Sequence, residues 1–181
     1  MSEVLERTQL RLSSKKVHGR MVNVVAALLR KELHIPNIYL NPKIPGVPVV
    51  DVLAVDRGGS GDLHAVDIKL AVELHSPAQR RMLVQTLKTY PFHFKYLAVP
   101  EFAISESGLD FTTYSDLFDE TGIGRIGILA FNSNIFDVSS FDSTNAAKEI
   151  LRPERFRVRG EGLVAIEKYL AKAKPDIEVR I

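Results

Sequence analysis

The spacing of apolar residues predicts an amphipathic helix over residues 14–33. Apolar side chains recur there every three or four positions, which is the period of one face of an α-helix. The residues of this stripe are Val17, Met21, Val24 and Leu28, with Val25 and Leu29 beside them. Ser13 or Ser14 can cap the start of the helix, and Pro36 ends the pattern. We therefore expect one side of this helix to pack against a core.

Runs rich in valine and isoleucine predict the strands of a sheet. The first two runs, 47–55 and 63–72, are joined by a glycine-rich turn at 57–62, which is typical of a hairpin. The other elements expected in this part are a short strand at 37–44, a helix at 76–90, and strands at 94–99 and 125–131. This mixture of helices and strands predicts an α/β fold with a mixed central sheet flanked by helices.

The pattern weakens beyond Asn132. A short helix at 145–151, a strand at 154–158 and a terminal helix at 161–172 are the elements that it favours. No clear linker precedes this tail. We therefore expect a single domain over 1–181, with its core in about 14–131 and a C-terminal elaboration in 132–181.

Composition restricts the chemistry. The chain has 181 residues, of which 45% are hydrophobic, enough for a sizeable core. It has no cysteine, which excludes disulfides, thiolate metal sites and a cysteine nucleophile, and an intracellular, cytoplasmic location is the expectation. No apolar stretch is long enough for a membrane helix, and the first residues lack the apolar core of a signal peptide. A net charge of +2 permits a nucleic-acid partner without demanding one.

Three charged residues stand out within the two hairpin runs. Asp51 separates the apolar runs 47–50 and 52–55, and Asp67 and Lys69 lie two positions apart in the next run. Successive strand residues point to opposite faces, so Asp67 and Lys69 share one face. If the runs pair as a hairpin, two carboxylates and an ammonium group converge. Such a group suits phosphodiester hydrolysis, because carboxylates hold a hard divalent cation and a lysine can orient water.

The order of these residues resembles the PD-(D/E)XK nucleases, which include many restriction endonucleases and Holliday-junction resolvases. The likeness rests on Pro48-Val-Val-Asp51 followed on the next strand by Asp67-Ile68-Lys69. It covers roughly residues 14–131, since a helix precedes these strands and a helix and a strand follow them. The resemblance implies a restriction-endonuclease-like, three-layer α/β/α fold.

The resemblance also implies roles for these residues. Asp51 and Asp67, with the main-chain carbonyl of Ile68, would bind Mg²⁺ or Mn²⁺, and Lys69 would hold the attacking water. Many family members add an acidic ligand from the first helix, for which Glu32 is the candidate here. RecB-like members carry a first-helix histidine, to which His18 is similar.

Further accessory residues follow the second strand. Glu73 has the parity of Asp67 and Lys69 and is a candidate additional ligand, and Gln79 is a candidate contact to a phosphate or a metal-bound water. The Gln-x-x-x-Tyr pattern of RecB-like members is not matched, because Tyr90 follows Gln85 by five positions.

Two basic groups are candidate DNA contacts. The first is Arg80 and Arg81 on the predicted helix 76–90. The second is formed by three alternating arginines, Arg155, Arg157 and Arg159, which a strand would place on one face. For the three alternating arginines, an ordinary solvated strand face is the slightly favoured explanation. A third group, Lys15-Lys16 with Arg20, is most simply a solvated helix start.

The function expected is Mg²⁺-dependent cleavage of DNA by an endonuclease or DNA-processing nuclease. The alternative is a catalytically inactive nuclease-fold protein that binds DNA or another protein, and a third reading is a small-molecule hydrolase or oligomeric structural protein. Symmetrical cutting of a duplex would favour a homodimer, and a domain of this size could depend on a partner protein for targeting. No membrane association is expected.

Overall fold

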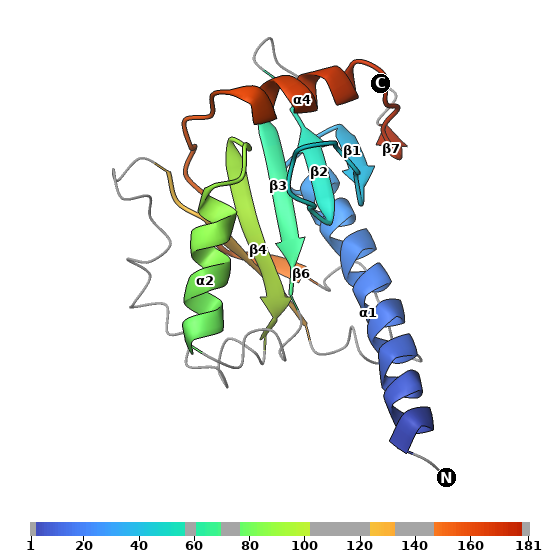
Figure 1. Cartoon of the computed structure of the whole chain (residues 1–181). Helices are drawn as coiled ribbons and strands as arrows, with labels where there is room; N and C mark the ends of the chain where they lie inside the picture. Colours follow the sequence, from blue (N-terminus) through green and yellow to red (C-terminus); the bar gives the residue numbers. More distant parts are fainter. Residues whose placement is uncertain (1–2, 57–60, 70–76, 102–123, 133–146, 179–181) are drawn as a thin grey trace.

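The computed structural model of the chain describes residues 3–56, 61–69, 77–101, 124–132 and 147–178 (Figure 1). Its centre is a seven-stranded sheet with the strand order β6-β5-β4-β3-β2-β1-β7. In chain order, the elements are α1 (Glu3–Lys31), β1 (Asn37–Leu40), β2 (Val52–Val55), β3 (Leu63–Ile68), α2 (Pro77–Lys88), β4 (Phe94–Pro100), β5 (Gly127–Phe131), β6 (Ala147–Leu151), α4 (Glu161–Leu170) and β7 (Ile177–Glu178).

The sheet is mixed, as expected from the sequence. Strands β1, β2 and β3 pair antiparallel in succession. Strand β3 then pairs parallel with β4, and β4 with β5. The helix α2 lies in the connection between β3 and β4, because parallel neighbours need a crossover to return the chain to the same edge. Antiparallel edge strands, β6 and β7, end the sheet.

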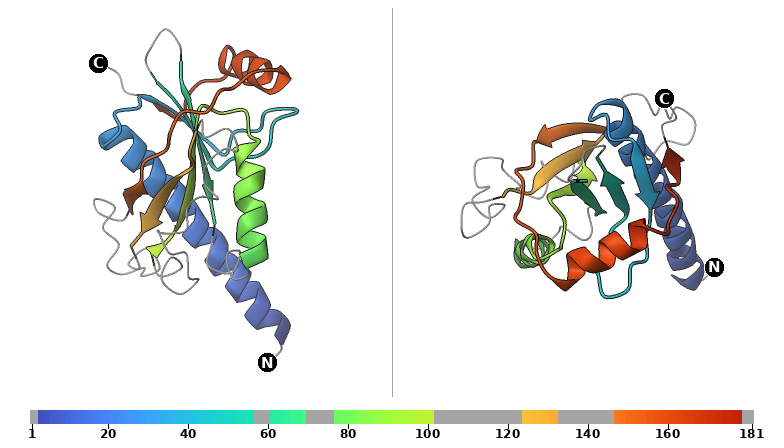
Figure 2. Two further views of the ribbon diagram at one scale, coloured as in Figure 1. Left: turned by 90° about the vertical axis from the view of Figure 1, so that its left-hand side faces the viewer. Right: turned by 90° about the horizontal axis from the view of Figure 1, so that it is seen from above.

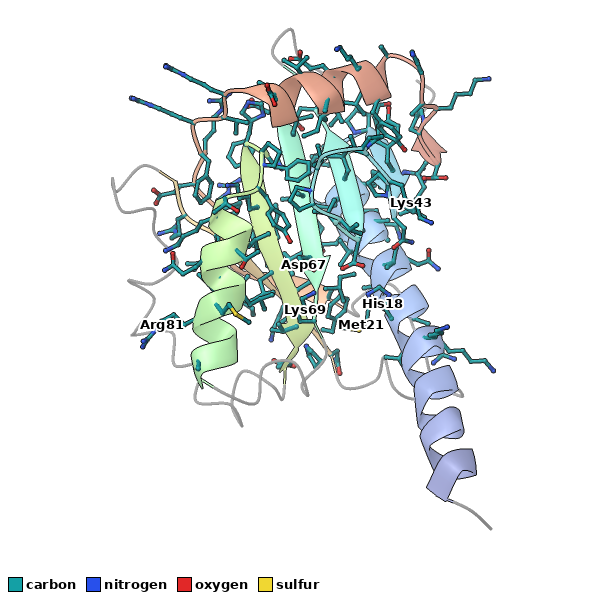
Figure 3. The ribbon with its side chains drawn as sticks, viewed as in Figure 1. His18, Met21, Lys43, Asp67, Lys69 and Arg81 are labelled. Carbon is teal, nitrogen blue, oxygen red and sulfur yellow. The ribbon has the colours of Figure 1, made fainter. Side chains whose placement is uncertain are left out.

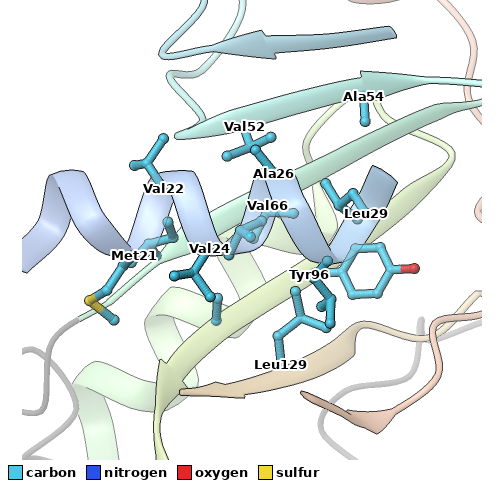
Figure 4. Close-up of a cluster of buried hydrophobic side chains, with 14 of the residues drawn as sticks. Met21, Val22, Val24, Ala26, Leu29, Val52, Ala54, Val66, Tyr96 and Leu129 are labelled. Atoms are coloured by element: carbon cyan, nitrogen blue, oxygen red, sulfur yellow. The ribbon is translucent and has the colours of Figure 1, made fainter. Parts of the chain in front are cut away.

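Helix α1 covers one face of the sheet (Figure 4). Met21, Val25 and Leu29 are fully buried on it, at the spacing that the apolar stripe predicts. They pack against side chains of β2, β3, β4 and β5 that alternate along each strand, namely Val52, Ala54, Val66, Ile68, Tyr96, Ala98, Leu129 and Phe131. This cluster is the larger part of the core and fixes the position of α1 along the strands.

Helices α2 and α4 cover the opposite face, so the fold has three layers, α/β/α (Figure 2). Val84 and Leu87 of α2 pack on β4 and β5. Ile166 of α4 packs on β2 and β3, with Leu163 and Leu170 beside it, as the predicted stripe requires. No helix among the described residues is long and apolar enough to cross a membrane.

Two predictions for the N-terminal half are wrong in detail. Helix α1 begins at Glu3, so neither Ser13 nor Ser14 caps it. Residues 47–50 are not a strand, and β2 begins only at Val52. Pro48 lacks the N–H that a ladder partner would need, and its neighbour Val49 is exposed. The 70–72 part of the second predicted strand lies outside the described residues.

Two predictions for the tail are also wrong. Residues 147–151 are the strand β6 rather than a helix, although Ala, Lys and Glu favour helices. Pairing with β5 satisfies that strand's outer hydrogen-bonding groups, and this outweighs local propensity. Residues 154–158 form only an isolated bridge between Glu154 and Arg125. The alternation that suggested a strand reflects Phe156, which is buried while its neighbours are exposed.

We predict opposite effects of alanine at two glycines. A Cβ on Gly127 in β5 would lie 2.8 Å from Pro153 Cδ and 2.9 Å from Tyr96 Cδ1, so Gly127→Ala should destabilise the fold by about 1–3 kcal/mol. At Gly19 in α1 no atom lies within 4 Å, and Gly19→Ala should stabilise by about 1 kcal/mol. Urea unfolding measures both. Equal stability of the two variants would contradict this packing.

Candidate functional site

The register of the β2–β3 hairpin brings the two predicted aspartates together. Val52 lies across from Val66, and Asp51 continues the ladder by donating its main-chain N–H to the Val66 carbonyl at 3.0 Å. One more step in this antiparallel register puts Asp51 opposite Asp67. The alternation along β3 places Asp67 on the face that carries Leu63 and Ala65, under α2 and α4.

Asp51 is fixed by contacts from two other elements. Its Oδ2 accepts a hydrogen bond from the Ile68 main-chain N–H at 2.7 Å. Its Oδ1 lies 3.1 Å from Nε2 of His18 on α1. The side chain of Asp51 is only 15% exposed, so these contacts replace most of its water. Helix α1 therefore contributes directly to this end of the hairpin.

Asp67 and Lys69 form an ion pair at the end of β3. Lys69 Nζ lies 3.0 Å from Asp67 Oδ1, and the side chains of the two residues are 23% and 8% exposed. The Lys69 main-chain N–H donates to the Ala98 carbonyl at 2.9 Å, which holds this residue against β4. A carboxylate as buried as Asp67 needs a compensating positive charge, and Lys69 provides one. Figure 3 shows His18, Asp67 and Lys69 near this end of the hairpin.

Tyr90, just after α2, lies within electrostatic range of this group. Burial raises the pKa of its hydroxyl, and the negative charges of Asp67 and Asp51 raise it further, while Lys69 lowers it. The hydroxyl therefore stays protonated and available as a hydrogen-bond donor. The sequence predicted no role for Tyr90, because its spacing from Gln85 did not fit the RecB-like pattern. The sequence feature that could have indicated a role for Tyr90 is its position directly after the helix that covers the face carrying Asp67.

The donor set suits a hard cation. Two carboxylates and a main-chain carbonyl, that of Ile68, are oxygen ligands of the kind that Mg²⁺ prefers, and Mg²⁺ keeps several waters. Among the described residues no group of three or more His, Cys, Asp or Glu side chains is arranged to hold a metal ion. Within the described part of the chain, the ligands for a metal would thus be the two aspartates, the Ile68 carbonyl and solvent.

Of the two first-helix residues predicted to act at the site, only His18 reaches the aspartates. His18 contacts Asp51, whereas Glu32 lies fourteen residues further along, about 21 Å at the rise of an α-helix. Glu32 is exposed, and its charge acts instead on Glu149 of β6, whose pKa is raised mainly by burial. The structure therefore does not bring Glu32 to the aspartates.

The remaining accessory residues are only partly placed. Glu73 and the side chains of Gln79 and Arg80 lie outside the described residues. Arg81 is exposed on α2 (Figure 3).

The three alternating arginines lie toward the other end of β3. Arg155 donates to Asp62 from Nη2 at 2.8 Å and from Nε at 3.1 Å. This hydrogen bond lowers the pKa of Asp62. Asp62 precedes β3 and Asp67 is near its end, a separation of about 17 Å along a strand. Arg157 and Arg159 are exposed in the same segment, but no strand arranges the three residues as predicted.

Comparisons with known proteins assign no family. No family model matches the chain, and no curated protein matches it. Among solved structures, a protein of unknown function from Silicibacter pomeroyi, SPO1766, is similar over 81% of this chain and 79% of its own, with 16% identity and a TM-score of 0.45.

We predict that His93 makes the fold sensitive to mild acid. Its Nδ1 accepts a hydrogen bond from the Leu63 main-chain N–H at 3.0 Å, and burial, followed by the charge of Arg155, lowers its pKa below 6.5. Below pH 6.5 the unfolded chain therefore binds the proton more readily than the folded chain, and stability falls as pH falls. The limiting slope is about 1.4 kcal/mol per pH unit.

Urea unfolding between neutral and mildly acidic pH tests this expectation. His93→Asn keeps an acceptor near Nδ1 but does not titrate, so its stability should depend less on pH than that of the wild type. A difference between the two proteins that is the same at every pH would contradict the expectation, because it would mean that His93 binds its proton equally well in the folded and the unfolded chain.

Proposed function

We propose that this protein is a metal-dependent nuclease of the PD-(D/E)XK type that hydrolyses phosphodiester bonds in DNA. The observation that carries the proposal is the hairpin register, which brings Asp51 opposite Asp67 with the Lys69 ammonium 3.0 Å from an Asp67 oxygen. Hydrolysis of a phosphodiester needs negative groups to hold a cation and a positive group beside the attacking water, and these residues supply both.

The order of the elements supports the same proposal. Helix α1 precedes three antiparallel strands, Asp51 directly precedes the second and Asp67 lies on the third, and α2 leads to the parallel strand β4. The resemblance implied a helix before the two motif strands and a helix and a strand after them. The restriction-endonuclease-like class is therefore part of the proposal.

In this proposal each side chain has a distinct role. Asp51 and Asp67 hold Mg²⁺ or Mn²⁺ together with the Ile68 carbonyl, and the cation, when bound, neutralises charge on the phosphate. Lys69 donates a hydrogen bond to the attacking water and stabilises the hydroxide that develops from it. Asp67 holds the Lys69 ammonium in place through their contact at 3.0 Å.

Two further residues support that arrangement. His18 positions Asp51 through the contact at 3.1 Å. The protonated Tyr90 hydroxyl is a donor for a phosphate oxygen, since its pKa is raised.

Cleavage of DNA is the first test. We expect the wild type to cut a mixture of duplex, branched and single-stranded DNA only with Mg²⁺ or Mn²⁺, and Asp67→Asn and Lys69→Met to lose at least about 100-fold in rate, since each removes a charge acting in the transition state. Gel analysis of end-labelled substrates measures the rate.

Asp56→Asn is the matched control, because Asp56 belongs to the same hairpin but lies at its opposite end. It should cut like the wild type. Cutting that survives in the Asp67 and Lys69 variants would reject this site. If no variant and not even the wild type cuts DNA, but DNA still binds without metal, a non-catalytic DNA-binding protein would be favoured. The contacts of Asp51 with His18 and of Asp67 with Lys69 would then have a structural role.

Metal binding has a readout that does not depend on cleavage. A ligand that binds the folded state raises the melting temperature, so Mg²⁺ should raise the Tm of the wild type in a concentration-dependent way. In Asp51→Asn and Asp67→Asn the rise should disappear, while Asp56→Asn should keep it. An equal rise in all four proteins would place any Mg²⁺ away from the two aspartates.

A further inference from the structure

The N-terminal part of α1 is the most asymmetrically charged segment of the chain. From Arg7 to Arg20 it contains five basic residues and no acidic residue. Since the chain has 24 Lys and Arg and 22 Asp and Glu, the rest of it holds 19 basic residues against 22 acidic ones. The positive net charge of the protein thus comes entirely from this segment, and everything else is net negative.

The structure places this segment beside the aspartates. Helix α1 packs on the sheet from about Val17 onward, and its earlier residues continue past the sheet (Figures 1 and 2). His18, in contact with Asp51, lies at the transition between the two parts. Lys15 and Lys16 are exposed one turn before it. The basic segment therefore begins at the candidate site and extends away from it.

Helical periodicity shows which basic positions of the segment lie on the side of α1 that carries His18. Positions 11 and 15 lie seven and three residues before His18, so they are on the same side of α1 as the histidine that reaches Asp51. The fourteen residues from 7 to 20 span about 20 Å, which matches about six successive phosphates along one strand of a duplex.

The chemistry of the segment indicates its partner. It contains no Phe, Tyr or Trp, so it offers no platform on which unpaired bases could stack. Lysines and arginines at helical spacing instead suit the regularly spaced phosphates of double-stranded DNA. The rival group at 155–159 fits less well, because Arg155 is already held by Asp62 and lies toward the other end of β3.

We infer that residues 7–20 of α1 bind the sugar–phosphate backbone of a DNA duplex on one side of the candidate site. This inference deepens the proposed function and rests on it for the identity of the substrate. It assigns to α1 two tasks, since the helix positions Asp51 through His18 and guides the substrate toward that carboxylate.

Salt-dependent binding tests the surface. Affinity for a fluorescent duplex is measured by anisotropy in EDTA, so that no cleavage occurs, over a series of salt concentrations. Each lost phosphate contact reduces the slope of log K against log salt by about 0.9. Arg11→Gln/Lys15→Gln should therefore reduce the slope by about 1.8 relative to the wild type.

Arg157→Gln/Arg159→Gln is the matched control, since it removes the same charge from the other end of the fold, and its slope should equal that of the wild type. A reduced slope in this control with an unchanged slope in the α1 variant would overturn the inference. So would binding of the wild type that is stronger to single strands than to the duplex, or no salt-dependent binding at all.

These outcomes are separable from the proposed function. Magnesium-dependent cleavage with unchanged binding by the α1 variant would retain the nuclease and reject the surface. Binding that depends on Arg11 and Lys15, without cleavage by the wild type, would retain the surface and reject the nuclease. Circular dichroism of the double variants verifies that they are folded.

Discussion

The pairing of β2 with β3 is the constraint on which the rest of the structure depends. Its register buries Val52 and Val66 against α1 while it brings Asp51 across from Asp67. A slip by one residue would turn every side chain of one strand to the other face, so the apolar core and the aspartate pair require the same register. The core thus holds two carboxylates opposite each other at the end of the hairpin. Each has its own local partners, since Lys69 pairs with Asp67 while the Ile68 N–H and His18 contact Asp51.

Helix α1 connects this polar group to the core. Its buried residues fix where the helix lies along the strands, and that position determines that His18, rather than Glu32, reaches Asp51. The helix therefore cannot shift by a turn without uncovering the sheet and losing the Asp51 contact. A polar contact that depends on apolar packing in this way keeps its geometry even though it is partly exposed to water.

The sequence predicted the central strands, α2, α4 and the Asp51–Asp67–Lys69 group, because each depends on local periodicity and on one hairpin. It did not predict contacts between distant segments. Nothing near Ala147 indicates that β5 has a free edge to pair with, and so β6 resembled a helix. The sequence could not distinguish Glu32 from His18 for a similar reason, since both fell in the predicted helix 14–33 and only the packed position of α1 shows which of them reaches Asp51. The role of Arg155 as the partner of Asp62 was likewise hidden by a sequence separation of 93 residues.

Charge is distributed along the chain in a way that local packing does not explain. Like charges that follow one another along a helix repel, so stability alone gives no reason to collect five basic residues in one helical segment and leave the remainder negative. A negative body would be repelled by DNA over most of its surface, and this repulsion orients the approach as much as the basic segment attracts it. The attraction is then strongest where α1 begins to leave the sheet, at the residues that surround Asp51. In the proposed function, a field of this shape would direct a phosphate backbone to the end of the hairpin where Lys69 pairs with Asp67 and where both aspartates act on the hydroxyl of Tyr90.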